Sequence, residues 1–404
     1  MTQSFPDLRD ANLFRTNAPE AMFAQLRKEQ PVYWNDGGSE EGFWNLSRYA
    51  DVSACYRDHD WLSSLSGAIM GSSFHSDQDS ARSKMLVASD LPEHRNFRRV
   101  FLGALGPAMA QRIRQQLQAL LDRELGILLA DGGGDFARSI SRQLPVAALM
   151  TLLGIDESAA NHVVDLTDAV VGYRDETLSD LSVPEETRRA VAQIELLGFL
   201  DEILEERHAT QPRDDALSHF LAAERTGTLT RDEVIYNLVN LVFGGNETSA
   251  HTASGSLLLM MQEPWSYTAL VENPDLVPNA LTEMLRLTSV AAYVKRVATS
   301  DRTMHGTTIK AGQTVLLWIY SANRDPSEFE NPLELRLDRK ATNHLAFGVG
   351  IHRCVGATPA LVELETLLHA VAALKDVRLI PDGEPVRLQS NFIRGFTSLP
   401  VRVK

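Results

Sequence analysis

The chain has 404 residues, of which 44% are hydrophobic and 23% charged, the ordinary balance of a globular protein with a large core. Its formal net charge of −14 argues against nucleic acid as a partner. No apolar run approaches membrane-spanning length and the N-terminus lacks signal-peptide features, so we expect a cytoplasmic protein without a membrane anchor. Its two cysteines suit a reducing compartment.

The N-terminal part opens with loop and turn residues. A helix is predicted over 19–28, followed by strand-like segments at 32–34 and 42–46 and by a second helix that starts at 48. Cys55 falls on this second helix, and we interpret it as a core residue.

Residues 62–89 show no hydrophobic period. Long loops without structure are uncommon and often functional, although a mobile surface loop is an equally open interpretation. The candidates for a pocket wall in this stretch are Met70, Phe74, Met85 and Leu86.

His94 and Arg98 lie four residues apart, so on a helix they share a face. Two stacked cations repel each other unless an anion lies opposite, and the alternative is a solvated basic face. Arg95 and Arg99 would point elsewhere, forming a basic patch that is a plausible docking site on an acidic protein.

Helical periodicity dominates residues 101–230, for example over 115–129 and 191–206. The glycine run at 131–135 is interpreted only as a turn between helices, because it lacks the Lys-Ser/Thr pair of a phosphate-binding loop.

A capping box, Thr230 with Glu233, predicts the start of a helix that is apolar nearly all round over 234–243. The next residues break local rules, because 244–245 are glycines and 246–249 put four polar groups into a buried segment. Such inconsistencies are expected at functional sites.

Glu283 and Arg286 have the spacing of an ion pair on one helix face, which alone is a weak signal. The tail, 377–404, alternates like strands around a turn at 381–383, and 391–395 reads as a hairpin.

The stretch 347–360 carries three glycines around Cys354, and a helical run follows directly. A thiolate near a helix N-terminus is stabilised by the helix dipole. A dinucleotide fingerprint would need glycine where Arg353 stands, and a zinc site would need further cysteine or histidine ligands. A buried structural cysteine is the remaining alternative.

These residues, F-G-x-G-x-H-x-C-x-G-x-x-x-A, resemble the haem-binding loop of the cytochrome P450 family. The resemblance implies haem b as cofactor, with the Cys354 thiolate as the iron ligand. It places His352 where family members hydrogen-bond a haem propionate, and it makes Phe347, Gly348 and Gly356 part of the cofactor-binding loop.

The family resemblance extends to other motifs in the same order along the chain. His94-x-x-x-Arg98 resembles the helix at the haem propionates, and Arg296 matches a third propionate ligand. The run G-G-x-E-T-S resembles the oxygen-activating segment of the long central helix, with Glu247 as the acid and Thr248 as the hydroxyl that holds water and relays protons. A structural alternative for Thr248 is a hydrogen bond to the carbonyl four residues earlier.

By the same resemblance the fold is mainly α with a small β region, and residues 1–404 form a single haem-thiolate monooxygenase domain. Residues 62–89 and 166–187 would cover the substrate pocket. Residues 290–294, where valine replaces a proline frequent in the family, would line this pocket, and the 391–395 hairpin would reach into it.

Glu283 and Arg286 resemble a structural pair of the family that is usually completed by an arginine, where this chain has Glu334. Arg324 or Arg336 is expected to substitute for it.

The function that the resemblance implies is insertion of one oxygen atom from O2 into a C–H bond of a small organic substrate. Asn246 resembles P450s that act on lipids and others that act on carrier-bound aminoacyl groups, so the substrate is expected to be lipid-like or a secondary metabolite, free or carrier-bound. Electrons would come from a separate ferredoxin or flavodoxin and its reductase, and the protein would be a monomer. The alternatives are a peroxide-driven P450, disfavoured by Glu247 and Thr248, and a non-catalytic haem-binding carrier or gas sensor.

Overall fold

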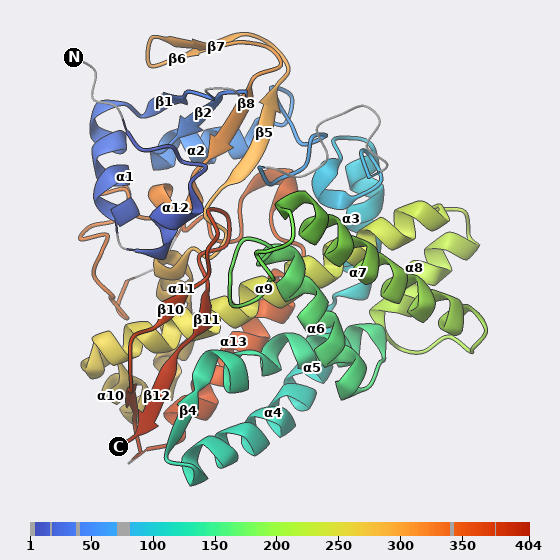
Figure 1. The fold of residues 1–404 in the computed structure, drawn as a ribbon, viewed down its shortest axis with the longest axis vertical. Helices are drawn as coiled ribbons and strands as arrows, with labels where there is room; N and C mark the ends of the chain where they lie inside the picture. The colour runs from blue at the N-terminus through green and yellow to red at the C-terminus, as the bar shows by residue number, and fades with distance from the viewer. Residues whose placement is uncertain (1–4, 17, 38–40, 71–80, 340–342, 376) are drawn as a thin grey trace.

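The computed structural model describes residues 5–16, 18–37, 41–70, 81–339, 343–375 and 377–404. Helices make up most of the molecule, and short strands form small sheets beside the N-terminal helices and near the C-terminus (Figure 1). The predicted class, mainly α with a small β region, is confirmed. No described helix has both the length and the apolar composition needed to cross a membrane.

The helices are α1 (Ala18–Glu29), α2 (Tyr49–Arg57), α3 (Glu93–Ala104), α4 (Pro107–Ala130), α5 (Gln143–Leu153), α6 (Glu157–Val171), α7 (Glu185–His208), α8 (Ala216–Arg225), α9 (Arg231–Gln262), α10 (Pro264–Glu272), α11 (Val277–Thr288), α12 (Ile319–Ala322) and α13 (Ala357–Ala372). The short helical turns are η1 (Ala11–Arg15), η2 (Leu86–Ala88), η3 (Ala137–Ser141), η4 (Pro274–Leu276) and η5 (Gly350–His352). The strands are β1 (Val32–Asn35), β2 (Phe43–Leu46), β3 (Leu62–Ser63), β4 (Gly133–Asp135), β5 (Val294–Ala298), β6 (Arg302–Met304), β7 (Thr307–Ile309), β8 (Thr314–Leu317), β9 (Leu379–Pro381), β10 (Val386–Arg387), β11 (Phe396–Ser398) and β12 (Pro400–Val403).

Helix α9 is the longest element and crosses the middle of the molecule (Figure 1). Its predicted capping box is present, because the Glu233 N–H donates to the Thr230 hydroxyl at 3.3 Å and the Glu233 carboxylate accepts from the Thr230 N–H at 2.7 Å. The helix continues through Gly244 and Gly245, where an added Cβ would meet no protein atom within 4 Å. These glycines therefore leave open space beside the helix rather than relieve a clash.

The main hydrophobic core is helical. Helix α9 packs against α5 and α11, and α4 packs against α5 and α13. Fully buried residues such as Leu117, Leu153, Val234 and Leu281 join these helices into one cluster. This arrangement fixes α9 relative to α13, and hence relative to the cysteine loop from which α13 starts.

The larger sheet has the order β1-β2-β8-β5-β3. β2 and β8 are parallel, and the other neighbours are antiparallel. The two predicted N-terminal strands thus pair with each other and with residues 314–317, far away in the sequence. This sheet places β5, which carries Arg296, beside the loop that follows α2.

The prediction that residues 131–135 form only a turn is wrong. Strand β4 within this run pairs with β12, so the glycine run is part of a sheet with the C-terminal strand. Gly133 has φ of +154°, and a Cβ there would lie 2.5 Å from the Val401 carbonyl oxygen. Glycine is needed at this position because the two strands approach each other so closely. The strand was not predicted because three residues are too few to show the two-residue period of a β-strand.

Candidate active site

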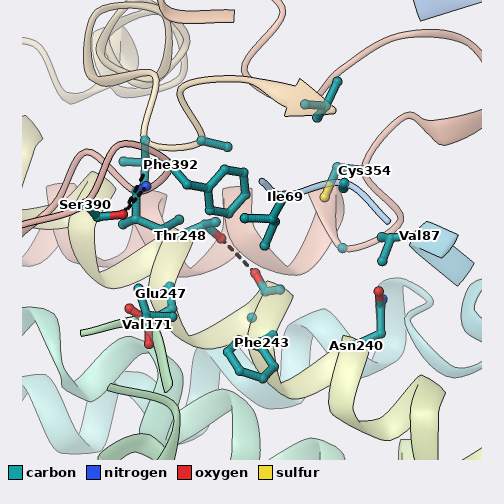
Figure 2. Close-up of a pocket in the computed structure, with 18 of the residues that line it drawn as sticks. Ile69, Val87, Val171, Asn240, Phe243, Glu247, Thr248, Cys354, Ser390 and Phe392 are labelled. Carbon is teal, nitrogen blue, oxygen red and sulfur yellow. Dashed lines mark hydrogen bonds between the residues drawn. The ribbon is translucent and has the colours of Figure 1, made fainter. Parts of the chain in front are cut away.

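A cavity of about 1170 Å³ lies between α9, α3 and the loop that precedes α13. Its interior wall is largely apolar, and Figure 2 shows residues from several segments converging on it. The labelled apolar residues among them are Ile69, Val87, Val171, Phe243 and Phe392. A cavity of this size and lining suits an organic cofactor or ligand rather than a bare ion.

The loop that carries Cys354 is shaped by glycines. Gly348 and Gly350 have φ of +62° and +78°, and a Cβ on Gly350 would lie 3.0 Å from the Tyr56 carbonyl oxygen. The Cys354 N–H donates to the Phe347 carbonyl at 2.8 Å, which closes the loop. The sulfur is thereby presented to the cavity, across from Thr248 of α9 (Figure 2).

The Cys354 thiol lies below the protein surface, and the area that it exposes faces the cavity. Burial raises its pKa, whereas a hydrogen bond from the Gly356 N–H and the charges of Arg353 and Arg98 lower it. A metal ion deprotonates a coordinating thiol, so this sulfur is poised to become a ligand rather than a free nucleophile.

Four basic side chains predicted to bind one anionic group line the same cavity, namely His94, Arg98, Arg296 and His352. The rings of His94 and His352 lie 4.3 Å apart. The guanidinium of Arg98 donates to the Arg353 carbonyl at 2.7 Å, and that of Arg296 donates to the Lys295 carbonyl at 2.7 Å. His352 Nε2 lies 2.9 Å from the Ser64 hydroxyl.

No carboxylate lies within ion-pair distance of these four groups in the part of the chain that the structure describes. Burial lowers the pKa of His94 to about 4 and that of His352 to about 2, and it also lowers the pKa values of Arg98 and Arg296. None of the four forms an ion pair within the residues that the structure describes, and the buried Nε2 of His94 has no hydrogen-bond partner there. The two desolvated guanidinium groups are costly unless an anion compensates them, and a nearby anion would favour the protonated form of both histidines. The donors therefore fit a buried dicarboxylate such as the two haem propionates.

On the opposite wall, Glu247 and Thr248 point in different directions. The Thr248 hydroxyl faces the cavity and donates to the Gly244 carbonyl at 2.8 Å (Figure 2), so the predicted structural hydrogen bond is present. Glu247 is buried and lies beside Val171, away from Cys354. Because the Thr248 proton is committed to a carbonyl, its oxygen is left to accept a hydrogen bond from a water in the cavity.

Comparison with known proteins decides the family. The family profile described as Cytochrome P450 matches residues 11–404. The chain belongs to the cytochrome P450 family. Members of this family are oxidoreductases that hold haem iron through a cysteine thiolate, and haem b is the cofactor that this cavity fits.

Similar P450s have bacterial sources. Linalool 8-monooxygenase of Pseudomonas putida is 31% identical over 98% of both chains. Cytochrome P450 NovI of Streptomyces niveus is 32% identical over 95% of this chain and 93% of its own. Among solved structures, P450 OxyD, involved in the biosynthesis of vancomycin-type antibiotics, matches with a TM-score of 0.87 and 30% identity over 98% of this chain and 99% of its own.

Most of the predicted pocket residues of this P450 do line the cavity. Met70, Met85 and Leu86 lie in its wall, whereas Phe74 is outside the described residues. Val290, Ala291 and Val294 of the expected segment 290–294 line the cavity, whereas Ala292 and Tyr293 are buried in a core cluster. Asn391, Phe392 and Ile393 of the C-terminal loop also line the cavity. Cys55 is buried in the core beside the sheet, as predicted.

Sequence reasoning missed the N-terminal contribution to the cavity mouth. Asp10 and Asn12 line the cavity because the C-terminal loop contacts this N-terminal segment. Gln389 Nε2 donates to Asn12 Oδ1 at 3.0 Å, and Asn391 Nδ2 donates to the Leu8 carbonyl at 3.3 Å. These contacts join residues more than 370 positions apart, and no local pattern predicts them.

Arg324 and Arg336 do not complete the Glu283–Arg286 pair, so that expectation is wrong. Arg286 donates to Glu283 at 2.7 and 2.8 Å, and the third member is Arg339, whose Nε lies 3.0 Å from both Glu283 oxygens. Arg324 instead pairs with Glu20 at 2.8 Å. The Arg336 side chain is on the surface, paired with acidic neighbours in its own segment.

Proposed function

We propose that Cys354 is the proximal ligand of haem iron and that His94, Arg98, Arg296 and His352 neutralise the haem propionates. The proposal rests on the thiol and the four basic groups that line one largely apolar cavity and form no ion pair among the described residues. Phe347, Gly348 and Gly356 would shape the loop against the haem face, and the Gly356 N–H would moderate the thiolate charge.

Bound haem would supply the iron that activates O2, with thiolate charge favouring O–O cleavage. The chain would supply the protons. Thr248 would hold a water in the cavity through its free lone pair, and Glu247, one residue earlier, would feed protons toward that water. The proposed reaction is insertion of one oxygen atom into a C–H bond, with the second atom leaving as water after two electrons and two protons have been added.

The proposed substrate is a small, mainly apolar molecule, such as a lipid-like compound or secondary metabolite, because the inner wall of the cavity is apolar. The relatives named for linalool and for antibiotic biosynthesis act within this broad class. The cavity mouth, by contrast, carries charged side chains such as Asp10, Arg174 and Glu185. A carrier-bound substrate would leave its polar tether at this rim.

We further propose that electrons come from NADPH through a separate reductase and a ferredoxin or flavodoxin, to a monomeric enzyme in the cytoplasm. The matched P450 profile occupies 394 of the 404 positions (residues 11–404), so these residues supply the haem domain and the electron donor is proposed to be a separate protein.

The observation that carries the proposal is the pairing of a thiol with a helix hydroxyl across one cavity, and Thr248→Ala tests it. The variant should bind haem and ligand like the wild type but should release more hydrogen peroxide and less product per NADPH, by on the order of 10²-fold in product rate. Ligands are first screened by the haem spectrum, with linalool and testosterone among the terpenoid and steroid probes.

Thr252→Ala is the matched control. Its hydroxyl makes the same kind of bond, to the Thr248 carbonyl at 2.7 Å, one turn further along α9. Equal coupling in wild type and Thr248→Ala would contradict the proposed role. Absence of any NADPH-dependent product across the probes that shift the spectrum would favour a non-catalytic haem protein.

A further inference from the structure

A second cavity, of about 310 Å³, lies on the other side of α9 from Cys354. Its wall is formed by residues of α6, α9, β11 and the segment before α5. Only Glu247 and Val171 line both cavities among the described residues. Glu247 therefore separates the proposed haem cavity from a second space, and it is the one titratable group common to both.

His251 lies beside Glu247, one turn along α9. Nδ1 of His251 accepts the Phe396 N–H at 3.3 Å, so a neutral ring carries its proton on Nε2. That nitrogen lies 3.3 Å from a Glu247 carboxylate oxygen. The ring is held in place because the Gly395 backbone packs on it, so closely that an added Cβ would lie 2.5 Å away.

The other Glu247 oxygen, Oε1, is buried and has no hydrogen-bond partner in the described part of the chain. A buried carboxylate oxygen without a partner is costly, so a proton or a water is expected there. Glu247 thus has one oxygen within 3.3 Å of His251 Nε2 and another that is available for proton transfer.

Asp168 of α6 is a second carboxyl that lines this cavity, together with Glu247. Burial and the neighbouring Glu247 charge raise the pKa of Asp168 well above its usual value, and Arg142, 3.4 Å away, offsets this only in part. Two carboxyls that line one small cavity do not both ionise readily, so Asp168 is expected to keep a proton that it can pass to Glu247. About 32% of the Asp168 side chain remains exposed, which gives it contact with solvent.

We propose that Asp168 supplies protons to Glu247 from the second cavity and that His251 positions Glu247 to receive them. The proposal rests on the proposed function, in which Glu247 passes protons toward Thr248. For each proton that leaves Glu247, Asp168 donates one to the Glu247 carboxylate, and a water in the second cavity reprotonates Asp168. No redox change occurs in these steps, and Arg142 keeps the pair from binding two protons at once.

Infrared spectroscopy of the resting, haem-loaded protein tests for the proton on Asp168 without turnover. The difference spectrum between wild type and Asp168→Asn should show the carbonyl stretch of a protonated carboxylic acid, and this band should shift in heavy water. Asp165→Asn is the matched control, because Asp165 lies three residues earlier on α6 and also pairs with Arg142, at 2.8 Å. A difference spectrum for Asp168 with no such band overturns the proposal.

Proton delivery is measured without any substrate, as O2 consumption driven by NADPH through a plant-type ferredoxin and its reductase. Asp168→Asn should slow O2 reduction to water by about ten-fold, release more hydrogen peroxide and increase the solvent isotope effect, whereas Asp168→Glu should restore all three. His251→Leu should resemble Asp168→Asn.

The variants also separate this proposal from the one on which it rests. If Glu247→Gln is impaired and Asp168→Asn behaves like wild type, Glu247 is fed by another path and the relay is refuted. If Glu247→Gln and Asp168→Asn both behave like wild type, the proposed role of Glu247 in proton supply is refuted as well.

Discussion

At the scale of single residues, the two cysteines of the chain show how surroundings decide a role. Cys55 is packed in the core beside the sheet, where burial raises its pKa to about 12. Cys354 lies in a glycine-shaped loop that faces the cavity, where the Gly356 N–H and the charges of Arg353 and Arg98 lower its pKa against the effect of burial. Only the second environment leaves room for a metal ion beside the sulfur, and a metal ion deprotonates a coordinating thiol.

We therefore expect Cys354→Ser to abolish the red-shifted Soret band of the reduced protein with carbon monoxide, because this band requires a thiolate ligand. Cys55→Ser is the control and should keep the band, even if it unfolds more easily. A Cys354→Ser protein that retains the band would show that another residue ligates the iron.

The basic cluster leads to a second prediction at this scale. Removing Arg98 or His94 takes a charge-assisted or hydrogen-bonding donor from a buried anion, and such bonds contribute about 1.5–3 kcal/mol. Arg98→Leu and His94→Leu should each release haem on the order of ten-fold faster, measured by transfer to an excess of apomyoglobin. Arg95→Leu, on the exposed face of the same helix, should not change the rate.

Residues that act within one contiguous motif were predictable from the sequence. Thr230 and Glu233 make the predicted capping box, and Cys354 lies in the loop that its glycines indicate. The Asp168–His251 environment was not predictable, because it joins α6, α9 and β11 in space with no motif in any of them. Local patterns report local geometry and carry no information on which distant side chains meet.

At the scale of elements, the buried Glu283 carboxylate joins α11 to the segment that leads toward the cysteine loop. Glu283 and Arg286 are fully buried, and Arg339 adds a second guanidinium from that segment. Arg286 also donates to the carbonyls of Asn323 and Pro332, so one cluster fixes three stretches of backbone. Its role is to hold the path of the chain before Cys354.

Glu283→Gln should therefore destabilise the protein strongly, by about 3–5 kcal/mol in the free energy of unfolding, because two buried cations lose their counter-charge. Chemical denaturation followed by circular dichroism measures this, and haem content should fall in parallel. Arg336→Met is the control, since its ion pairs are on the surface and contribute little. A Glu283→Gln protein as stable as wild type would show that the cluster is not structural.

Long elements were predicted better than short ones, for a physical reason. Helix α9 spans 32 residues, so its pattern of buried residues extends over many turns. A capping box marks its first residue. Strand β4 has three residues, two of them glycines, and exists only because β12 lies beside it. A strand that depends on its partner has no signal of its own in the sequence.

At the scale of the whole molecule, charge is distributed unevenly. The chain carries a net charge of −14, yet Arg95, Arg99 and Arg353 are exposed, and none of them forms an ion pair within the described residues. Arg95 and Arg99 lie one turn apart on α3. Arg98 of the same helix binds the Arg353 carbonyl, which brings this basic helix against the cysteine loop.

An acidic electron donor would be attracted to this basic face, which lies next to the thiolate side of the proposed haem. Charges at the rim of an interface act mainly on the association rate, and salt screens them. Changing Arg95, Arg99 and Arg353 together to glutamate should slow the first electron transfer from a ferredoxin by about ten-fold or more at low ionic strength. The difference should shrink as salt is added.

Stopped-flow reduction of the haem in carbon monoxide-saturated buffer, at several salt concentrations, measures this rate. Replacing three exposed arginines away from α3, such as Arg225, Arg378 and Arg402, keeps the change in net charge equal and controls for long-range effects. A control protein slowed as much as the α3 variant would mean that net charge, not this face, governs association. An unchanged rate in the α3 variant at low salt would place the electron donor elsewhere on the molecule.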